Sequence, residues 1–157
     1  MSKIIHFADQ GLLNFNSIDI FNIIIDIDKY PEFLPWCSQI KIISRNDSQI
    51  VADVTMKFKG MRASYRSKIT HVPPSDNDIG YIDIVSKHGA FKYLQSQWQF
   101  HHKAPKQTLI KFSIDCEFQS RLMHYTMSVM YKRAQEKVMS AFKGRIYSLL
   151  RYVNASE

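Results

Sequence analysis

The alternation of apolar and polar residues in the middle of the chain predicts a β-sheet. In the clearest stretch the apolar positions are Ile50, Ala52, Val54, Met56 and Phe58. A period of two places these side chains on one buried face of a strand, with polar residues on the other face. The same pattern predicts strands over residues 3–8, 40–42, 62–72, 81–86, 96–100 and 110–118. Short turns such as the one at Gly60 join them, so we expect an antiparallel sheet.

The pattern changes near the end of the chain, where residues 121–153 predict one long amphipathic helix. Apolar side chains recur there at three- and four-residue steps, which places them on one stripe of the helix. They are Met123, Met127, Met130, Tyr131, Ala134, Val138, Ala141, Phe142, Leu149 and Tyr152. Arg145 is the one charged residue on this stripe, where its stem can lie against the core. This apolar stripe must be buried against other parts of the chain, and we expect the sheet to wrap around the helix and bury it.

Two short helical segments are expected between the first strand and the sheet. Ser17 is predicted to cap a helix that stops before Pro31. The segment YPEFLPWC, residues 30–37, then contains two prolines, which predict a rigid turn of helix or loop. A second interruption is expected over residues 87–94, within the sheet. Its apolar side chains, expected to be exposed, are Phe91, Tyr93 and Leu94.

Length and composition indicate one ordinary globular domain, residues 1–157. Apolar residues make up 45% of the chain and charged residues 22%, and no apolar run approaches the roughly 20 residues that span a bilayer. No signal or transit peptide is evident, so a cytoplasmic protein is expected. Cys37 and Cys116 are far apart in the sequence, which favours reduced thiols over a disulfide or a zinc site.

The positive charge is concentrated in the last segment. Seven basic residues and one acidic residue lie within residues 121–153, whereas the whole chain carries a formal charge of +7. A basic helix face can contact anionic lipid or ribosomal RNA, and a simply solvated face is the alternative. Aromatic side chains are not interleaved with these charges, so no DNA partner is predicted.

The sequence contains little that predicts catalysis. The six histidines are scattered, without the spacing of a metal site, and no phosphate-binding glycine loop or nucleophile elbow is present. The carboxylates of the predicted strands fall on their polar faces. They are Asp53, Asp83, Asp115 and Glu117. We therefore predict no catalytic residue, no metal and no cofactor.

The inward-facing side chains of the sheet and the helix are large and adaptable. They are Met56, Phe58, Trp98, Phe100, Phe112, Phe118, Met123, Met127 and Met130. Methionine and aromatic side chains suit a flexible apolar ligand. From these residues alone a plain core is the favoured interpretation, and a ligand pocket is the alternative.

Three separated motifs resemble one known family. They are YPEFLPWC at residues 30–37, GAFKYLQSQWQF at residues 89–100 and FQSRL at residues 118–122. Together they resemble the ubiquinone-binding branch of the START-like, polyketide cyclase-like superfamily, which also includes a ribosome-association toxin. The resemblance implies a helix-grip fold of the α+β class, with a lipid tunnel between the sheet and the last helix. It therefore reverses the preference for a plain core.

The resemblance also implies which residues line the tunnel mouth. One wall is formed by Tyr30, Phe33, Leu34, Pro35 and Trp36, and the other by Phe91, Leu94 and Trp98. Ala90 departs from the family, which usually has proline there, so this loop is expected to be looser. Trp36 favours the quinone-binding branch, since the toxin-like relatives tend to have a small residue at this position.

The expected function is non-enzymatic binding and delivery of ubiquinone or a similar polyprenyl lipid to respiratory or quinone-biosynthetic complexes. This implies peripheral association with the bacterial inner membrane. A toxin that binds a ribosomal subunit is the alternative, and a cyclase-type enzyme is the least favoured. The hairpin KFKGMR is expected to touch the membrane because Met61 forms an apolar point among basic residues. The residues expected at an anionic surface are Lys57, Lys59, Met61, Arg62, Lys132 and Arg133.

Overall fold

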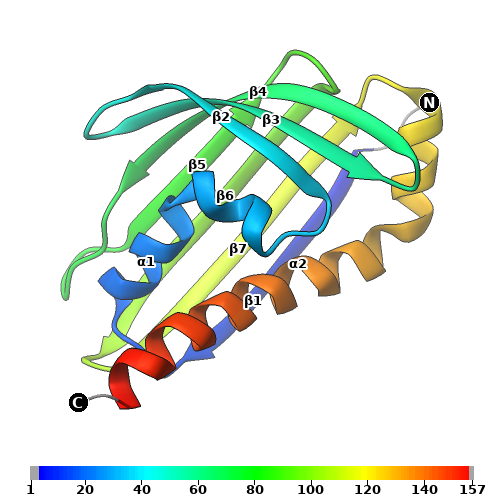
Figure 1. Ribbon diagram of the computed structural model, residues 1–157. Coiled ribbons are helices and arrows are strands. Elements are labelled where there is room, and N and C mark those ends of the chain that lie inside the picture. Colours follow the sequence, from blue (N-terminus) through cyan, green and yellow to red (C-terminus); the bar gives the residue numbers. More distant parts are fainter. Residues whose placement is uncertain (1–3, 156–157) are drawn as a thin grey trace.

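The computed structural model describes residues 4–155, with side chains to residue 151. Seven strands and three helical segments follow one another along the chain (Figure 1). They are β1 (Ile5–Leu13), α1 (Ser17–Ile25), the 3₁₀ helix η1 (Ile27–Glu32), β2 (Cys37–Arg45), β3 (Gln49–Phe58), β4 (Met61–Val72), β5 (Gly80–Ser86), β6 (Phe91–Ala104), β7 (Gln107–Phe118) and α2 (Arg121–Ala155). The two short helical segments expected after the first strand are thus present as α1 and η1.

All seven strands form one antiparallel sheet in the order β1-β7-β6-β5-β4-β3-β2. The sheet curves, and α1, η1 and α2 all lie on its concave side (Figure 1). The predicted α+β plan, in which a curved antiparallel sheet wraps around a long C-terminal helix, is confirmed. The period of two predicted the inner face correctly, since Ile50, Ala52 and Val54 are all buried.

The sheet holds α2 at Phe142, which is almost fully buried. Three aromatic rings surround its side chain, with centroid distances of 5.2 Å to Tyr30, 5.3 Å to Phe33 and 4.9 Å to Trp98. Two of these rings come from η1 and its end, and the third comes from β6. All three contacts are edge-to-face, an arrangement that aromatic pairs favour. Phe142 therefore joins the helix, the 3₁₀ segment and the sheet.

The buried side of α2 differs in part from the predicted stripe. Leu149 is 39% exposed, whereas Met139 and Ile146 are buried on either side of Phe142. Residues 139, 142 and 146 also follow steps of three and four, so periodicity alone could not choose between the two overlapping stripes. The side chain of Tyr152 lies outside the described residues.

The first strand and the first helix cap also differ from the prediction. β1 extends to Leu13, well beyond residue 8, because it pairs with β7 along its whole length; residue 3 lies outside the described range. The helix cap is Asn16 rather than Ser17, since the Asn16 Oδ1 atom accepts a hydrogen bond of 2.9 Å from the Ile18 amide.

The prediction that Phe91 and Leu94 are exposed was wrong. β6 begins at Phe91, and both side chains are buried. Phe91 pairs with Phe118 and Leu94 pairs with Cys116, and a register shift lies between residues 91 and 93. The irregularity lets positions three apart face the same side of the sheet, which a strict period of two does not allow.

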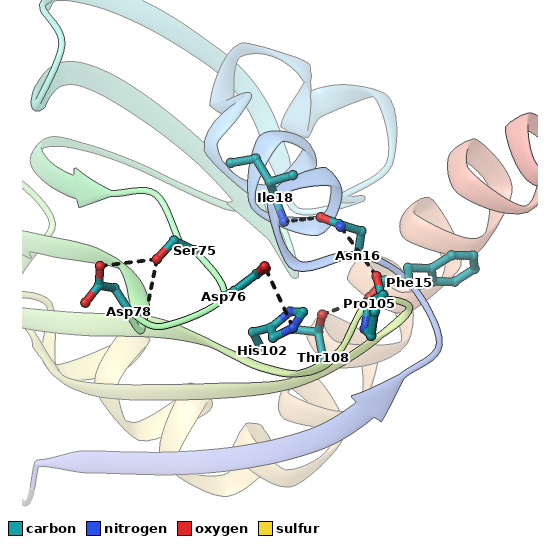
Figure 2. Close-up of polar contacts among 9 residues, drawn as sticks. All are labelled: Phe15, Asn16, Ile18, Ser75, Asp76, Asp78, His102, Pro105 and Thr108. Atoms are coloured by element: carbon teal, nitrogen blue, oxygen red, sulfur yellow. Dashed lines mark hydrogen bonds and ion pairs between the residues drawn. The ribbon is translucent and has the colours of Figure 1, made fainter.

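Polar contacts close the end of the sheet where α1 begins (Figure 2). The Thr108 hydroxyl donates a hydrogen bond of 2.8 Å to the Phe15 carbonyl, and the Asn16 side-chain amide donates one of 3.4 Å to the Pro105 carbonyl. The side chain of His102, in β6, lies 3.7 Å from the carboxylate of Asp76 in the β4–β5 loop. The first two contacts fix the start of α1 to the β6–β7 turn and to β7, and the third joins β6 to the β4–β5 loop.

We expect Phe142→Ala to destabilise the protein by about 3–5 kcal/mol, because it removes a ring from the centre of a packed core. Tyr125→Ala is the matched control on the same helix, since Tyr125 is 69% exposed; it should change stability by less than about 0.5 kcal/mol. Urea unfolding followed by circular dichroism measures both. Equal unfolding free energies for the two variants would contradict the central role of Phe142.

Candidate functional site

The buried apolar side chains form two separate clusters on the concave face. The larger one lies beneath α1 and the C-terminal half of α2, around Phe142 and Trp98. The smaller one lies at the start of α2. Its buried members are Phe91, Leu94, Cys116, Phe118 and Met123. Between the two clusters lies a further part of the concave face of the sheet, called the floor below. This floor is the candidate site.

Four inward-facing residues on the floor contact both clusters. They are Met56, Tyr65, Ile84 and Ile114. Each is only partly buried, although inward-facing neighbours on the same strands, such as Ile82 and Phe112, are buried. The concave face is therefore incompletely covered here, and apolar surface remains available to a ligand.

The helix above this floor packs less closely than its two ends. Within the described part of the chain, α2 has no buried side chain between His124 and Met139. Met127, Met130 and Tyr131 are partly buried over this stretch. The middle of α2 therefore covers the floor incompletely, and it contributes adaptable methionine side chains.

α2 is also bent, since its first turns stand at an angle to the remainder (Figure 1). Two side chains in these turns donate hydrogen bonds to carbonyls one turn earlier. The Thr126 hydroxyl donates to the Leu122 carbonyl at 2.8 Å, and the Ser128 hydroxyl donates to the His124 carbonyl. Such bonds compete with the helical ladder and favour bending.

The structure divides the predicted tunnel residues into three groups. Buried are Leu34, Phe91, Leu94, Trp98, Phe100, Phe112, Phe118 and Met123. Partly buried are Tyr30, Phe33, Trp36, Met56, Phe58, Met127 and Met130, and Pro35 is exposed. Phe100 packs edge-on against Phe21 of α1 at 5.3 Å, so it lies in the larger cluster beneath α1. Ligand contact by any of these residues stays a prediction.

The segment after α1 forms a fixed aromatic wall. The Tyr30 hydroxyl donates a hydrogen bond to the Ile24 carbonyl, which ties η1 to the end of α1. The Arg145 guanidinium lies 5.3 Å from the centre of the Phe33 ring and 3.9 Å from the Glu32 carboxylate. Only the stem of Arg145 was expected to lie against the core, whereas the charged guanidinium itself lies over the Phe33 ring and is also paired with Glu32.

The β5–β6 loop fixes Tyr65 at the other side of the floor. Gly89 forms an isolated bridge with Tyr65, and the Ala90 amide donates a hydrogen bond of 3.0 Å to the Ser64 carbonyl. The Tyr65 ring packs edge-on against Phe91 at 4.8 Å. The sequence indicated neither the role of Tyr65 nor that of Phe142, because both depend on contacts between distant segments.

Three titratable groups beside the floor, Cys37, Cys116 and Tyr65, stay protonated and neutral at physiological pH. Burial raises the pKa of the Cys37 thiol to about 11 and that of the Cys116 thiol to about 12. Burial also raises the pKa of Tyr65 well above its ordinary value, with smaller contributions from the two thiols. Thiols that stay protonated are poor nucleophiles, so this arrangement favours binding of an uncharged molecule over covalent chemistry.

The residues expected at an anionic surface are mostly exposed. They are Lys57, Lys59, Arg62, Lys132 and Arg133, whereas Met61 is half-buried against the smaller cluster. Other apolar side chains are exposed on the first turns of α2: Leu122, Tyr125 and Val129 are each more than 60% accessible. Their steps of three and four place them on one stripe beside the basic residues.

Two hollows of about 360 and 460 Å³ lie on the sheet. Polar side chains of the convex face predominate in both, including Gln97, Gln99 and Lys111 in one, and Lys41 and Asp53 in the other. Polar lining does not suit an apolar ligand. We therefore place the candidate site on the concave face.

The fold and this incompletely covered apolar floor define a helix-grip protein. The family model described as polyketide cyclase / dehydrase and lipid transport matches residues 18–143, and the chain belongs to this family. Among the described residues no helix is long and apolar enough to cross a membrane.

Two relatives and one solved structure illustrate the similarity. The ribosome association toxin RatA of Rickettsia prowazekii (strain Madrid E) is 31% identical over 92% of this chain and 98% of its own length. The mitochondrial coenzyme Q-binding protein COQ10 homolog B of Xenopus laevis is 26% identical, covering 93% of this chain and 61% of the relative. A STAR-related lipid transfer protein from Xanthomonas axonopodis shares the fold, with a TM-score of 0.76, 8% identity and coverage of 90% and 85%. The predicted START-like superfamily and helix-grip fold are confirmed.

We expect Gly89→Ala to destabilise the protein by about 2–4 kcal/mol. Gly89 has a φ of +81°, and an added Cβ would lie 2.4 Å from the Ser64 carbonyl oxygen. Gly60 is the matched control, because its φ of +76° is similar but nothing lies within 4 Å of an added Cβ. Gly60→Ala should therefore cost only about 1 kcal/mol. Thermal unfolding compares the two, and a larger loss at Gly60 would show that the loop contact is unimportant.

Proposed function

We propose that this protein binds ubiquinone or a similar polyprenyl lipid between the sheet and α2 and carries it without catalysing a reaction. The observation that supports this most directly is the partly exposed apolar floor formed by Met56, Tyr65, Ile84 and Ile114. Aliphatic and methionine side chains there offer contact area without demanding hydrogen bonds, which suits a prenyl tail.

The energy of such binding comes mainly from burial of the tail. Apolar surface removed from water contributes roughly 25 cal/mol per Å², from which the cost of ordering the tail is subtracted. The fixed aromatic wall reduces that cost on the protein side, because Tyr30 and Phe33 are already held by their contacts with Phe142. Trp36 is predicted to contact the ligand as part of this aromatic wall.

Delivery requires contact with a membrane, and the first turns of α2 supply a suitable surface. The exposed apolar stripe of Leu122, Tyr125 and Val129 can enter the interface, and Lys132 and Arg133 lie near it on the same helix. Each basic residue close to an anionic bilayer contributes about 1 kcal/mol. In this proposal the protein works at the cytoplasmic side of the inner membrane, near respiratory or quinone-biosynthetic complexes. The basic residues of the β3–β4 hairpin, Lys57, Lys59 and Arg62, are part of the same proposed contact.

A second function is favoured by a specific observation. The relative named as a ribosome association toxin aligns with this chain over almost the whole length of both proteins. The exposed basic residues of α2, Lys132 and Arg133, could contact ribosomal RNA. Phosphate contacts would dominate that association, so it would weaken steeply as salt rises. This candidate needs the charged face of α2, whereas the carrier also needs the apolar floor.

For the carrier, we expect Met127→Lys to reduce the quinone extracted from the purified protein several-fold, because a charge beside the floor opposes an apolar ligand. Ser140→Lys is the matched control, since Ser140 is exposed on the same helix, and it should leave the quinone content unchanged. Organic extraction followed by mass spectrometry gives the stoichiometry. Full loading of a folded Met127→Lys protein would place the ligand elsewhere.

The two functions separate when the aromatic wall and the basic face are altered independently. A carrier should lose quinone in Trp36→Ala, while the double variant Lys132→Glu with Arg133→Glu mainly loses sedimentation with anionic vesicles. A toxin should tolerate Trp36→Ala, and the double charge reversal should abolish its salt-sensitive migration with ribosomal subunits. Arrest of translation by the overexpressed protein, combined with that second pattern, would replace the carrier by the toxin.

A further inference from the structure

The hydroxyl groups on the concave face fall into two classes. The first class is satisfied by main-chain carbonyls: Tyr30 donates to Ile24, Thr108 to Phe15 and Ser86 to His88. These three hydroxyls lie outside the uncovered part of the floor, and each stabilises a connection between elements.

The second class includes Tyr65, Ser67 and Ser96 on the strands of the sheet. Their hydroxyls have no hydrogen-bond partner among residues 4–155. Within the same range, the buried side-chain polar atoms that lack a partner are Nδ1 of His71 and Nδ1 of His102, so the three hydroxyl oxygens retain accessible surface. An unpaired hydroxyl in apolar surroundings is costly unless water or a ligand bonds to it.

Strand pairing places all three on the inner face, close to the uncovered floor. Tyr65 pairs with Val54 and Ser67 pairs with Ala52, both of which are inward-facing. Ser96 lies between Ile84 and Ile114, the two floor residues of β5 and β7. The free hydroxyls therefore border the apolar surface that the proposed function assigns to a lipid.

Tyr65 is the best-positioned donor of the three. The bridge with Gly89 fixes its backbone, and the edge-on contact with Phe91 fixes its ring. Its side chain packs against both buried clusters, so it lies along the floor between them, and burial raises its pKa. Because that pKa is raised, the hydroxyl stays protonated and can donate.

We propose that Tyr65 is the residue that selects the head of the bound lipid, donating a hydrogen bond to an uncharged acceptor such as a quinone carbonyl, with Ser96 as a second donor. This inference rests on the proposed lipid-binding function and adds a chemical requirement to it. The head must carry a hydrogen-bond acceptor and no charge, since the titratable side chains described beside the floor, Tyr65, Cys37 and Cys116, are kept neutral by burial.

Tyr65→Phe tests the proposal because it removes the hydroxyl and keeps the ring. The probes are a short-tailed ubiquinone and an isoprenoid hydrocarbon of the same tail length, each titrated against the purified protein by calorimetry. We expect Tyr65→Phe to weaken binding of the quinone about three- to ten-fold. Binding of the hydrocarbon should stay unchanged, because the tail makes no use of the hydroxyl.

Two further variants serve as comparisons. Ser96→Ala should weaken quinone binding by a smaller factor, again without effect on the hydrocarbon. Thr108→Val is the matched control: it removes a buried hydroxyl that is already bonded to the Phe15 carbonyl, so it should lower thermal stability and leave the ratio of quinone to hydrocarbon affinity unchanged.

The outcomes separate this inference from the proposed function. If the wild-type protein binds neither probe, the lipid-binding function itself is wrong. If the wild type binds quinone and Tyr65→Phe binds it equally well, the function survives and the role of Tyr65 is refuted. An equal loss of quinone and hydrocarbon binding would also refute it, because the tyrosine would then act through packing alone.

Discussion

The packing of Phe142 against Tyr30, Phe33 and Trp98 is the constraint on which the rest of the structure depends. It attaches α2 to the sheet near the C-terminal end of the helix, where Met139 and Ile146 are also buried. A second attachment lies in the first turns, where Met123 and His124 are buried and His124 contacts Phe118 of β7. A helix of 35 residues held at two separated places leaves its middle free of close packing, and that middle spans the candidate site.

The chemistry of the site follows from this arrangement. The floor between the attachments is apolar but carries hydroxyls that nothing in the described chain satisfies, and its thiols stay protonated because they are buried. An environment of this kind stabilises neither a charge nor a reactive anion. It is suited to a neutral molecule with a long apolar part and a small polar head, which is the chemical character of a prenylated quinone.

The basic surface and the apolar floor are physically separate features of the same helix. Lys132 and Arg133 are exposed, so changes in their charge leave the residues beneath the helix in place. Proteins that share this fold can therefore differ in partner while keeping the interior, or differ in ligand while keeping the surface. The similarity of this chain both to a protein named for ribosome association and to one named for coenzyme Q binding is consistent with such independence.

The sequence by itself determined the elements, because periods of two and of three to four residues report directly which faces are buried. It gave the strands, the long helix and most of the inner face, and three motifs indicated the family. Tertiary structure decided the rest. Which of two overlapping stripes on α2 is buried depends on where Phe142 meets η1, and the inward turn of both Phe91 and Leu94 depends on a register shift between strands. Whether the Tyr65 hydroxyl has a hydrogen-bond partner depends on which distant segments of the chain meet around it. No local pattern in the sequence contains that information.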